Sequence, residues 1–171
     1  MLNVREGATA RTIRCGDSDE RHNGGFELPI SDFLPDRLGL AASRVVRAAE
    51  KRCLMPHGIG LAEWRVLALL NELDSTTAKT IGSISGMHKT KVSRAVAELE
   101  RRALISRKPN RNDLRESILS LSGAGRALVG EIAPEAQAFS QHLWGTLDGQ
   151  EQELIETALN KLVMAIEAHP G

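Results

Sequence analysis

Residues 88–102, HKTKVSRAVAELERR, combine one apolar stripe with one basic face. The apolar residues recur at the i, i+3, i+4, i+7 spacing of one side of an α-helix: Val92, Ala95, Val96, Leu99 and Ala103. At about 100° per residue, the opposite side carries Thr90, Ala97, Arg94 and Arg101. Hydroxyl and guanidinium donors on a narrow helix face contact base edges and phosphates in a DNA groove. The stretch therefore predicts a recognition helix, although a solvated amphipathic helix without a partner has the same pattern.

A basic hairpin follows this helix, in residues 106–121. Pro109 and the asparagines beside it are turn formers, and residues 117–121 alternate polar and apolar side chains as a half-buried strand does. The hairpin carries four cations: Arg107, Lys108, Arg111 and Arg115. Arg111, near the tip, is placed to enter a minor groove. The alternative is an ordinary charged surface hairpin, but its position directly behind the basic helix favours a DNA-binding wing.

Asp113 and Arg115 lie two residues apart and therefore on the same side of a strand. An exposed ion pair contributes little stability by itself. We nevertheless expect the Asp113 carboxylate to hold the Arg115 guanidinium by a charge-assisted hydrogen bond, and so to orient the wing.

A short helix and a tight turn precede the recognition helix. Residues 77–85 are expected to form this helix, and Thr76 or Thr77 can cap its N-terminus. Gly86 ends the helix and permits the bend, while the small Gly82 lets two helices approach closely. Helix, glycine turn and basic helix together predict a helix-turn-helix.

Five motifs in this order resemble the MarR family, the multiple-antibiotic-resistance regulators, over about residues 32–168. They are EWRVL at 63–67, TKVSR at 90–94, LERRALI at 99–105, DLR at 113–115 and LSLSGAG at 119–125. The resemblance implies a winged helix-turn-helix dimer that binds operator DNA and often releases it when a small molecule or an oxidant is sensed. Three positions depart from the family pattern: Ala103 in place of a glycine, His88 in place of a capping Asp or Ser, and Gly60–Leu61 in place of a threonine-containing cap.

The expected DNA contacts are assigned by position. Thr90, Lys91, Ser93 and Arg94 approach the major groove, whereas the arginines and the lysine of the hairpin serve the wing and its phosphate contacts. The full set of expected DNA-binding residues is Lys89, Thr90, Lys91, Ser93, Arg94, Arg101, Arg107, Lys108, Arg111 and Arg115.

Charge is distributed unevenly along the 171 residues, although the net charge is zero. Residues 86–116 contain nine Lys and Arg against four Asp and Glu, a net charge of +5, and residues 117–171 contain two against seven, a net charge of −5. A basic patch matters more for nucleic-acid binding than the total. No glycine-rich phosphate loop, activated nucleophile or recognisable carboxylate pair is present, so the sequence predicts neither an enzyme nor a cofactor.

The fold class expected is mainly α with a small β-hairpin wing, that is, a winged helix-turn-helix plus terminal dimerisation helices. The expected divisions are a mobile extension at 1–30, a dimerisation helix at 31–57, the DNA-binding domain at 58–121 and C-terminal dimerisation helices at 122–171. The family pairs its first and last helices between two copies, which sets two recognition helices about 34 Å apart on a pseudo-palindrome.

Several helices are predicted outside the helix-turn-helix. A single helix should span 32–55 and stop at Pro56, and a second should span 62–73, with Val66, Leu67, Leu70 and Leu73 inward and Trp64 in the core or at a domain seam. The segment 122–147 should bend or break near Pro134. Residues 148–151 resemble a capping box that opens a last helix with a broad apolar band.

The sequence indicates less about what the protein senses. In the family, ligands lodge between the dimerisation helices and the winged domain, and residues 33–38 resemble the first helix of members that respond to aromatic acids or their thioesters. The candidate pocket residues are Arg37, Arg44, His57, Trp64 and Arg65. A thiol-based redox sensor using Cys15 or Cys53 is an alternative, with Cys53 on an apolar face that favours burial.

Other classes of function receive less support. The five histidines lack the spacing of metal ligands, so no metal site is expected. No apolar stretch approaches the ~20 residues of a membrane helix, and no secretory signal is seen, which favours a cytoplasmic protein without membrane contact. A winged-helix protein-interaction module that does not bind DNA is the alternative of another class.

Overall fold

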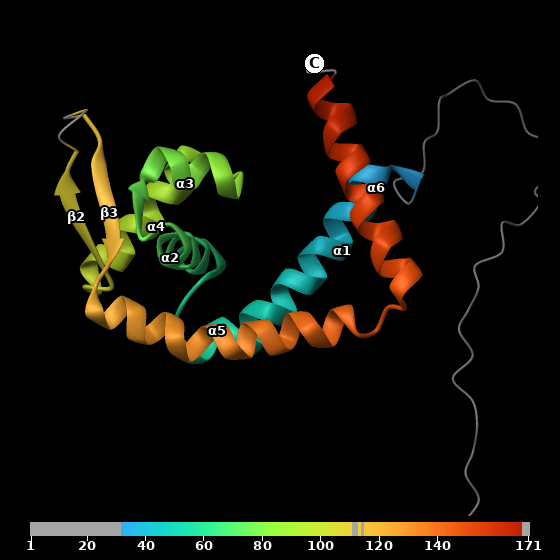
Figure 1. Cartoon of the computed structure of the whole chain (residues 1–171), viewed down its shortest axis with the longest axis horizontal. Coiled ribbons are helices and arrows are strands. Elements are labelled where there is room, and N and C mark those ends of the chain that lie inside the picture. Colours follow the sequence, from blue (N-terminus) through green and yellow to red (C-terminus); the bar gives the residue numbers. More distant parts are fainter. Residues whose placement is uncertain (1–31, 111–112, 114, 169–171) are drawn as a thin grey trace, which may run out of the picture. The chain divides into compact units, whose positions relative to one another are not determined.

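Figure 1 shows the computed structural model, which describes residues 32–110, 113 and 115–168. By its contacts the chain divides after Arg37, and the second unit, Leu38–Gly171, holds every element except the first turn of the first helix. The extension expected at 1–30 lies outside the described residues. Among the described residues, no helix is both long enough and apolar enough to cross a membrane.

The first helix is shorter than expected. α1 spans Leu34–Ala49 and continues as a π-helical turn, η2 (Glu50–Leu54), and a 3-10 turn, η3 (Met55–His57). The prediction of one helix over 32–55 was therefore wrong at both ends. The wider π turn brings Cys53 and Leu54 into the core, and such single turns interrupt α-helices at few but specific sites.

The turn after α1 does not end at its proline. Pro56 lies inside η3, at a position where its missing N–H costs nothing. The chain reverses instead at Gly58, whose φ of +64° is a left-handed conformation that favours glycine. The prediction that Pro56 stops the helix was therefore wrong by a few residues.

α2 (Leu61–Leu73) begins without a capping hydroxyl. Gly60 precedes it, and the Glu63 carboxylate accepts a hydrogen bond from the Gly60 N–H at 2.5 Å. A second carboxylate, that of Glu50, accepts from the Leu61 N–H at 3.1 Å. These two acidic groups satisfy N–H groups at the positive end of the helix, so the departure at Gly60–Leu61 leaves the helix intact.

The helix-turn-helix is followed by the wing, as expected, but the sheet has one more strand than the hairpin. The elements are β1 (Ser75–Thr77), α3 (Ala78–Ser85), α4 (Lys89–Arg101), β2 (Ile105–Pro109) and β3 (Ser117–Leu121). The sheet is antiparallel in the order β1-β3-β2. The unpredicted β1 consists of three polar residues, and it becomes a strand because it pairs with β3, Thr76 opposite Leu119.

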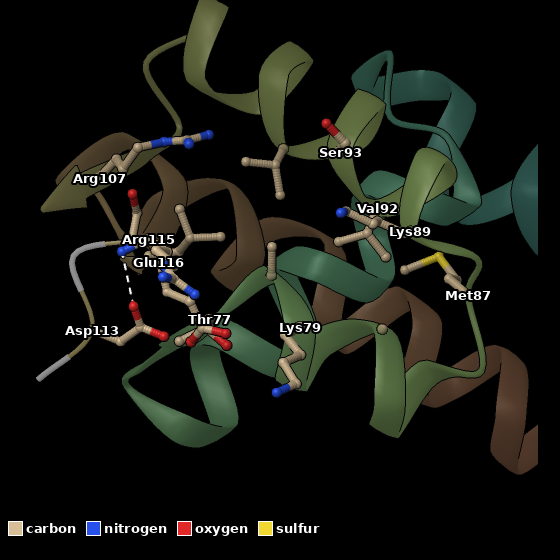
Figure 2. Close-up of a pocket in the computed structure, with 15 residues that line it drawn as sticks. Thr77, Lys79, Met87, Lys89, Val92, Ser93, Arg107, Asp113, Arg115 and Glu116 are labelled. Atoms are coloured by element: carbon tan, nitrogen blue, oxygen red, sulfur yellow. Dashed lines mark hydrogen bonds between the residues drawn. The ribbon is translucent and has the colours of Figure 1, made fainter. Parts of the chain in front are cut away.

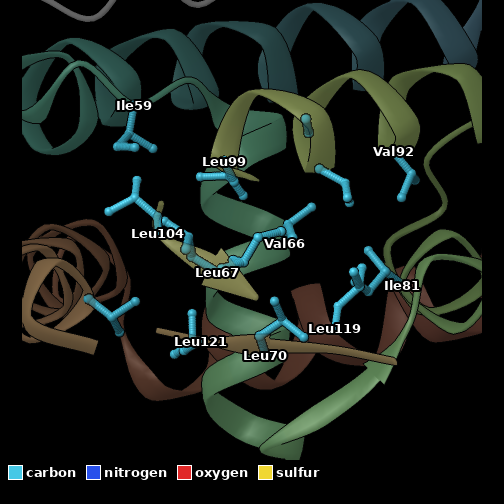
Figure 3. Close-up of a cluster of buried hydrophobic side chains, with 14 of the residues drawn as sticks. Ile59, Val66, Leu67, Leu70, Ile81, Val92, Leu99, Leu104, Leu119 and Leu121 are labelled. Carbon is cyan, nitrogen blue, oxygen red and sulfur yellow. The ribbon is translucent and has the colours of Figure 1, made fainter. Parts of the chain in front are cut away.

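The core lies where α2, α4 and the sheet meet (Figure 3). Apolar side chains from all of these elements are buried there, including Val66, Leu67, Leu70, Ile81, Val92, Leu99, Leu119 and Leu121. Trp64 packs against this cluster and is partly buried, as expected. Leu73, expected to point inward, is 39% exposed because it lies in the last turn of α2, beyond the neighbouring elements.

α5 (Gly123–Trp144) runs through Pro134 as one helix, so of the bend or break expected there, the break does not occur. Pro134 and Gly130, whose carbonyl loses its helical partner, are both exposed, and water can satisfy that carbonyl. At the other end, Ser122 caps α5 by accepting from the Gly125 N–H at 2.9 Å. A Cβ on Gly125 would lie 2.0 Å from the Leu104 carbonyl oxygen, so only glycine lets α5 approach the start of β2 this closely.

α6 (Gly149–Ala168) opens with the expected capping box. The Asp148 carboxylate accepts from the Gln150 and Glu151 N–H groups at 2.9 Å, and Glu151 accepts from the Asp148 N–H at 2.9 Å. Neither α1 nor α6 has a buried residue. The apolar band of α6 is exposed in the single chain: Leu154, Ile155, Leu159, Val163, Met164 and Ile166.

α4 ends at an alanine in a conformation that normally requires glycine. Ala103, expected on the apolar stripe, instead lies beyond the helix, exposed, with φ +54°. An L side chain in the left-handed region costs about 1–2 kcal/mol. The departure from the family's glycine is therefore a strained link between the recognition helix and the wing.

We expect Ala103→Gly to raise the free energy of unfolding by roughly 0.5–1 kcal/mol, because glycine removes the strain but loses more backbone entropy on folding. Ala97→Gly, in the exposed middle of α4, is the control and should lower it by about 0.5–1 kcal/mol. Urea unfolding followed by circular dichroism measures both. Equal destabilisation by the two glycines would show that Ala103 is not strained.

Candidate nucleic-acid interface

α4 has the two faces that its sequence predicts. Val92, Ala95, Val96 and Leu99 are buried, and Thr90, Arg94, Ala97 and Arg101 are exposed on the other side. His88 caps the helix, since its Nδ1 accepts a hydrogen bond from the Thr90 N–H at 3.3 Å. An unprotonated imidazole nitrogen thus replaces the Asp or Ser oxygen of the family pattern.

The turn before α4 fixes how the two helices meet. The Thr77 hydroxyl caps α3 by accepting from the Thr80 N–H at 3.2 Å, as expected. Gly86 ends α3 with φ +65°, and the Met87 N–H then donates to the Ser85 hydroxyl at 3.3 Å. At Gly82 an added Cβ would lie 3.3 Å from the Met87 carbonyl oxygen, so the helices meet closely there.

A cavity of about 740 Å³ opens between α4, α3 and the wing (Figure 2). Arg107 and Arg115 lie on its sheet side, and Lys89 and Ser93 lie on its α4 side. On the other flank of α4, a second hollow of about 640 Å³ is lined by Thr90, Lys91, Arg94 and acidic neighbours. The exposed side of α4 therefore stands between two hollows with donor groups on their walls.

Asp113 organises the wing differently from what the sequence predicts. Its carboxylate accepts a hydrogen bond from the backbone N–H of Arg115 at 2.9 Å, drawn as a dashed line in Figure 2, and not from the guanidinium. This is the local turn that Asp forms with the backbone two residues later. The Glu116 N–H donates to the Asp113 carbonyl at 3.0 Å, so Asp113 shapes the turn and the Arg115 side chain is left exposed. Arg111 lies outside the described residues.

Three arginines near the end of α4 are engaged within the chain. Arg101 pairs with Glu98 and Arg107 pairs with Glu100, each through two hydrogen bonds. Arg102 donates to the carbonyl oxygens of Gly58 at 2.7 Å and His57 at 3.2 Å. Sequence reasoning had assigned no such roles, although the i, i+3 spacing of Glu98 and Arg101 is a known signal for a pair.

The other described cations of α4 and the wing are free to contact a phosphate backbone. Among the described residues of α4 and the wing, the cations with neither an ion pair nor a carbonyl partner are Lys89, Lys91, Arg94, Lys108 and Arg115. All five are exposed. Lys79 of α3, which also lines the 740 Å³ cavity, is likewise exposed and without an ion pair. Positive charge that is exposed and unpaired attracts phosphate more strongly than charge already held by a carboxylate.

The candidate effector residues lie on separate elements. Arg37 and Arg44 are exposed on α1, and Arg65 is half-buried on α2. His57 lies 3.6 Å from the Glu131 carboxylate, measured from Nδ1. None of these residues, nor Trp64, lines either of the two hollows beside α4.

Cys53 has neither property of a sensing thiol. Its side chain is 1% exposed, and burial, with a smaller effect of the Glu135 charge, raises the pKa of the thiol. A redox cysteine needs access and a lowered pKa. Cys15, the other cysteine of the redox alternative, lies outside the described residues. In the described part of the chain, His, Cys, Asp and Glu form no group of three that could hold a metal ion.

In a Cys15→Ser variant, we expect Cys53 to resist alkylation by iodoacetamide at neutral pH in the folded protein, because its thiol is buried and burial also raises its pKa. The same variant in urea is the control and should be alkylated readily. Mass spectrometry follows the reaction. Alkylation at similar rates with and without urea would restore Cys53 as a sensor.

Known proteins resemble this chain in sequence and in fold. A model of the MarR family matches residues 57–116, which run from the turn before α2 to the residue before β3. The transcriptional repressor MprA of Escherichia coli K12 is 24% identical over 143 residues, which are 82% of this chain and 81% of MprA.

Two solved structures share the fold. A probable transcriptional regulator from Pseudomonas aeruginosa is 25% identical, with a TM-score of 0.70 over 78% of this chain and 99% of that one. A single-residue mutant of E. coli MarR, complexed with operator DNA, is 20% identical, with a TM-score of 0.71 over 80% of this chain and 99% of that one. These relatives are transcriptional regulators and not enzymes. The chain has the winged helix-turn-helix fold of these regulators, and its residues 57–116 match the MarR family model.

Proposed function

We propose that this protein is a sequence-specific regulator that binds a pseudo-palindromic operator as a homodimer. The exposed side of α4, with Thr90, Lys91, Ser93 and Arg94, enters the major groove. Arg115 and Arg111 serve the wing, and Lys89 and Lys108 contact phosphates. The observation that carries the proposal is the row of exposed, unpaired cations on α4 and the wing, separated by a hollow.

The mode of action proposed is repression. The relative MprA is named a transcriptional repressor, and a dimer seated on operator DNA blocks access to it. The proposal includes the division of the chain into a DNA-binding domain at 58–121 between dimerisation helices at 31–57 and 122–171. Unpaired arginines on α4 and the wing argue against a winged-helix module that has lost DNA binding.

Arg94→Ala should weaken binding to the selected site by about 1–3 kcal/mol and relax specificity, if the arginine reads a guanine. Lys89→Ala, which removes a proposed phosphate contact, should weaken binding to all sequences alike and reduce the salt slope by about 1. Fluorescence anisotropy on duplexes selected from a random pool, and on the DNA upstream of the gene, measures both effects.

Lys161→Ala, which removes the same charge from α6, is the control for the lysine. Its binding should match that of the unaltered protein. If the unaltered protein binds no duplex at low salt, or if Arg94→Ala binds DNA as tightly as the unaltered protein, a winged-helix module that does not bind DNA is favoured.

The homodimer is proposed from the terminal helices. α1 and α6 bury no residue in the single chain, and a band of exposed apolar side chains marks an association surface. Burying the band of α6 against a second copy would remove it from water and hold two α4 helices in one register.

Leu159 is 49% exposed within that band. We expect Leu159→Glu to convert the dimer to single chains in sedimentation velocity and to weaken operator binding, because a buried unpaired charge is costly. Asn160→Glu adds the same charge at the next, exposed position and should leave the dimer intact. A dimer that survives Leu159→Glu would place the interface elsewhere.

A small aromatic acid or its thioester is proposed as the effector. This part of the proposal rests on the resemblance of residues 33–38 to members that sense such compounds. Arg37, Arg44, His57, Trp64 and Arg65 are the residues proposed to meet it. Titrating benzoate-type acids into the operator-binding assay tests it, and release of DNA at concentrations that leave the fold unchanged is the expected result.

A further inference from the structure

Two glutamates of α4 each hold an arginine that was expected to contact DNA. Glu98 accepts from Nε and Nη2 of Arg101 at 2.9 and 2.5 Å. Glu100 accepts from Nε and Nη2 of Arg107 at 2.8 and 2.6 Å. Bidentate arginine–carboxylate pairs of this kind are strong and directional. The second pair also ties α4 to β2, since Arg107 lies in the strand.

Both glutamates lie beside groups proposed to contact DNA. Glu98 lines the hollow that it shares with Lys91 and Arg94. Glu100 is bound to Arg107, which lines the hollow on the opposite flank of α4. A carboxylate in either place repels a phosphate backbone that approaches α4.

Each pair leaves some of its arginine's donors free, but the carboxylate offsets the positive charge. The carboxylate occupies Nε and Nη2, so the Nη1 donors of Arg101 and Arg107 can still point elsewhere. A cation that already carries its own anion displaces no counterion from DNA, so it adds little to the salt-dependent affinity. The hydrogen bond from Arg101 lowers the pKa of Glu98, which keeps that carboxylate ionised at neutral pH.

We infer that Glu98 and Glu100 are a charge brake on sequence-independent DNA binding, which neutralises Arg101 and Arg107 and leaves Lys89, Lys91 and Arg94 to set the affinity of α4. The inference rests on the proposed function. Repulsive groups placed against the wrong partner are a recognised route to specificity. Here every DNA sequence offers the same phosphates, so the brake acts on all of them.

Glu98→Gln and Glu100→Gln keep the side-chain shape and remove the negative charge. We expect each to tighten binding to a mixed-sequence duplex, measured by fluorescence anisotropy. Because a freed cation adds about 0.9 to the salt slope, the gain should be about 3.5-fold larger at 50 mM than at 200 mM salt. Glu156→Gln, on the exposed surface of α6, is the matched control and should change nothing.

A second variant shows whether the gain passes through the arginine. In an Arg107→Gln background, Glu100→Gln should bring a smaller gain than it brings alone, because no guanidinium remains to be freed. A gain of equal size in both backgrounds would overturn the pairing as its cause. Thermal unfolding of each variant confirms that it is folded, and the Glu98–Arg101 pair, which lies within one helix, provides an independent test.

The outcomes separate this inference from the proposed function. If the unaltered protein binds no duplex at low salt, the proposed function fails. If it binds, and both glutamine variants bind equally or more weakly, the brake is overturned and the proposed function stands. Weaker binding would mean that Glu98 and Glu100 position their arginines on DNA.

Discussion

The burial of one side of α4 against α2 and the sheet is the constraint on which the rest of the molecule depends. Val92, Val96 and Leu99 have essentially no exposed surface, and removing such side chains from water is the main stabilising contribution in a domain of this size. Because the apolar stripe is buried, the opposite side must face solvent. The basic side chains therefore face solvent because of how the apolar side of α4 packs, and not because of contacts that they make themselves.

The wing depends on the same packing. β3 contributes Leu119 and Leu121 to the core and pairs on both edges, with β1 and β2. The hairpin is therefore anchored at its base, while Asp113 shapes the turn through the backbone. An anchored base places the wing beside α4, as recognition in two adjacent grooves would require.

Much of this could be predicted from local signals. The recognition helix, the caps at Thr77 and Asp148 and the glycine turn at Gly86 each depend on residues within one or two turns of each other. What could not be predicted depends on distant partners. The π turn at Glu50–Leu54 forms because it buries Cys53 in the core. β1 forms a strand only because it pairs with β3. The long side chains of the arginines can reach several nearby carboxylates, so their partners could not be predicted. The predicted hydrogen-bond partner of Asp113 was wrong for a local reason, because its spacing to Arg115 permits a bond to either the guanidinium or the backbone N–H.

The central claim is that two copies of this α4-and-wing unit, joined through α1 and α6, bind one duplex. The most direct test is the stoichiometry of the protein–DNA complex, measured by native mass spectrometry on a selected operator. Our account predicts two chains per duplex across the range of concentrations in which the complex forms. A complex with a single chain per operator, formed with full affinity, would contradict it.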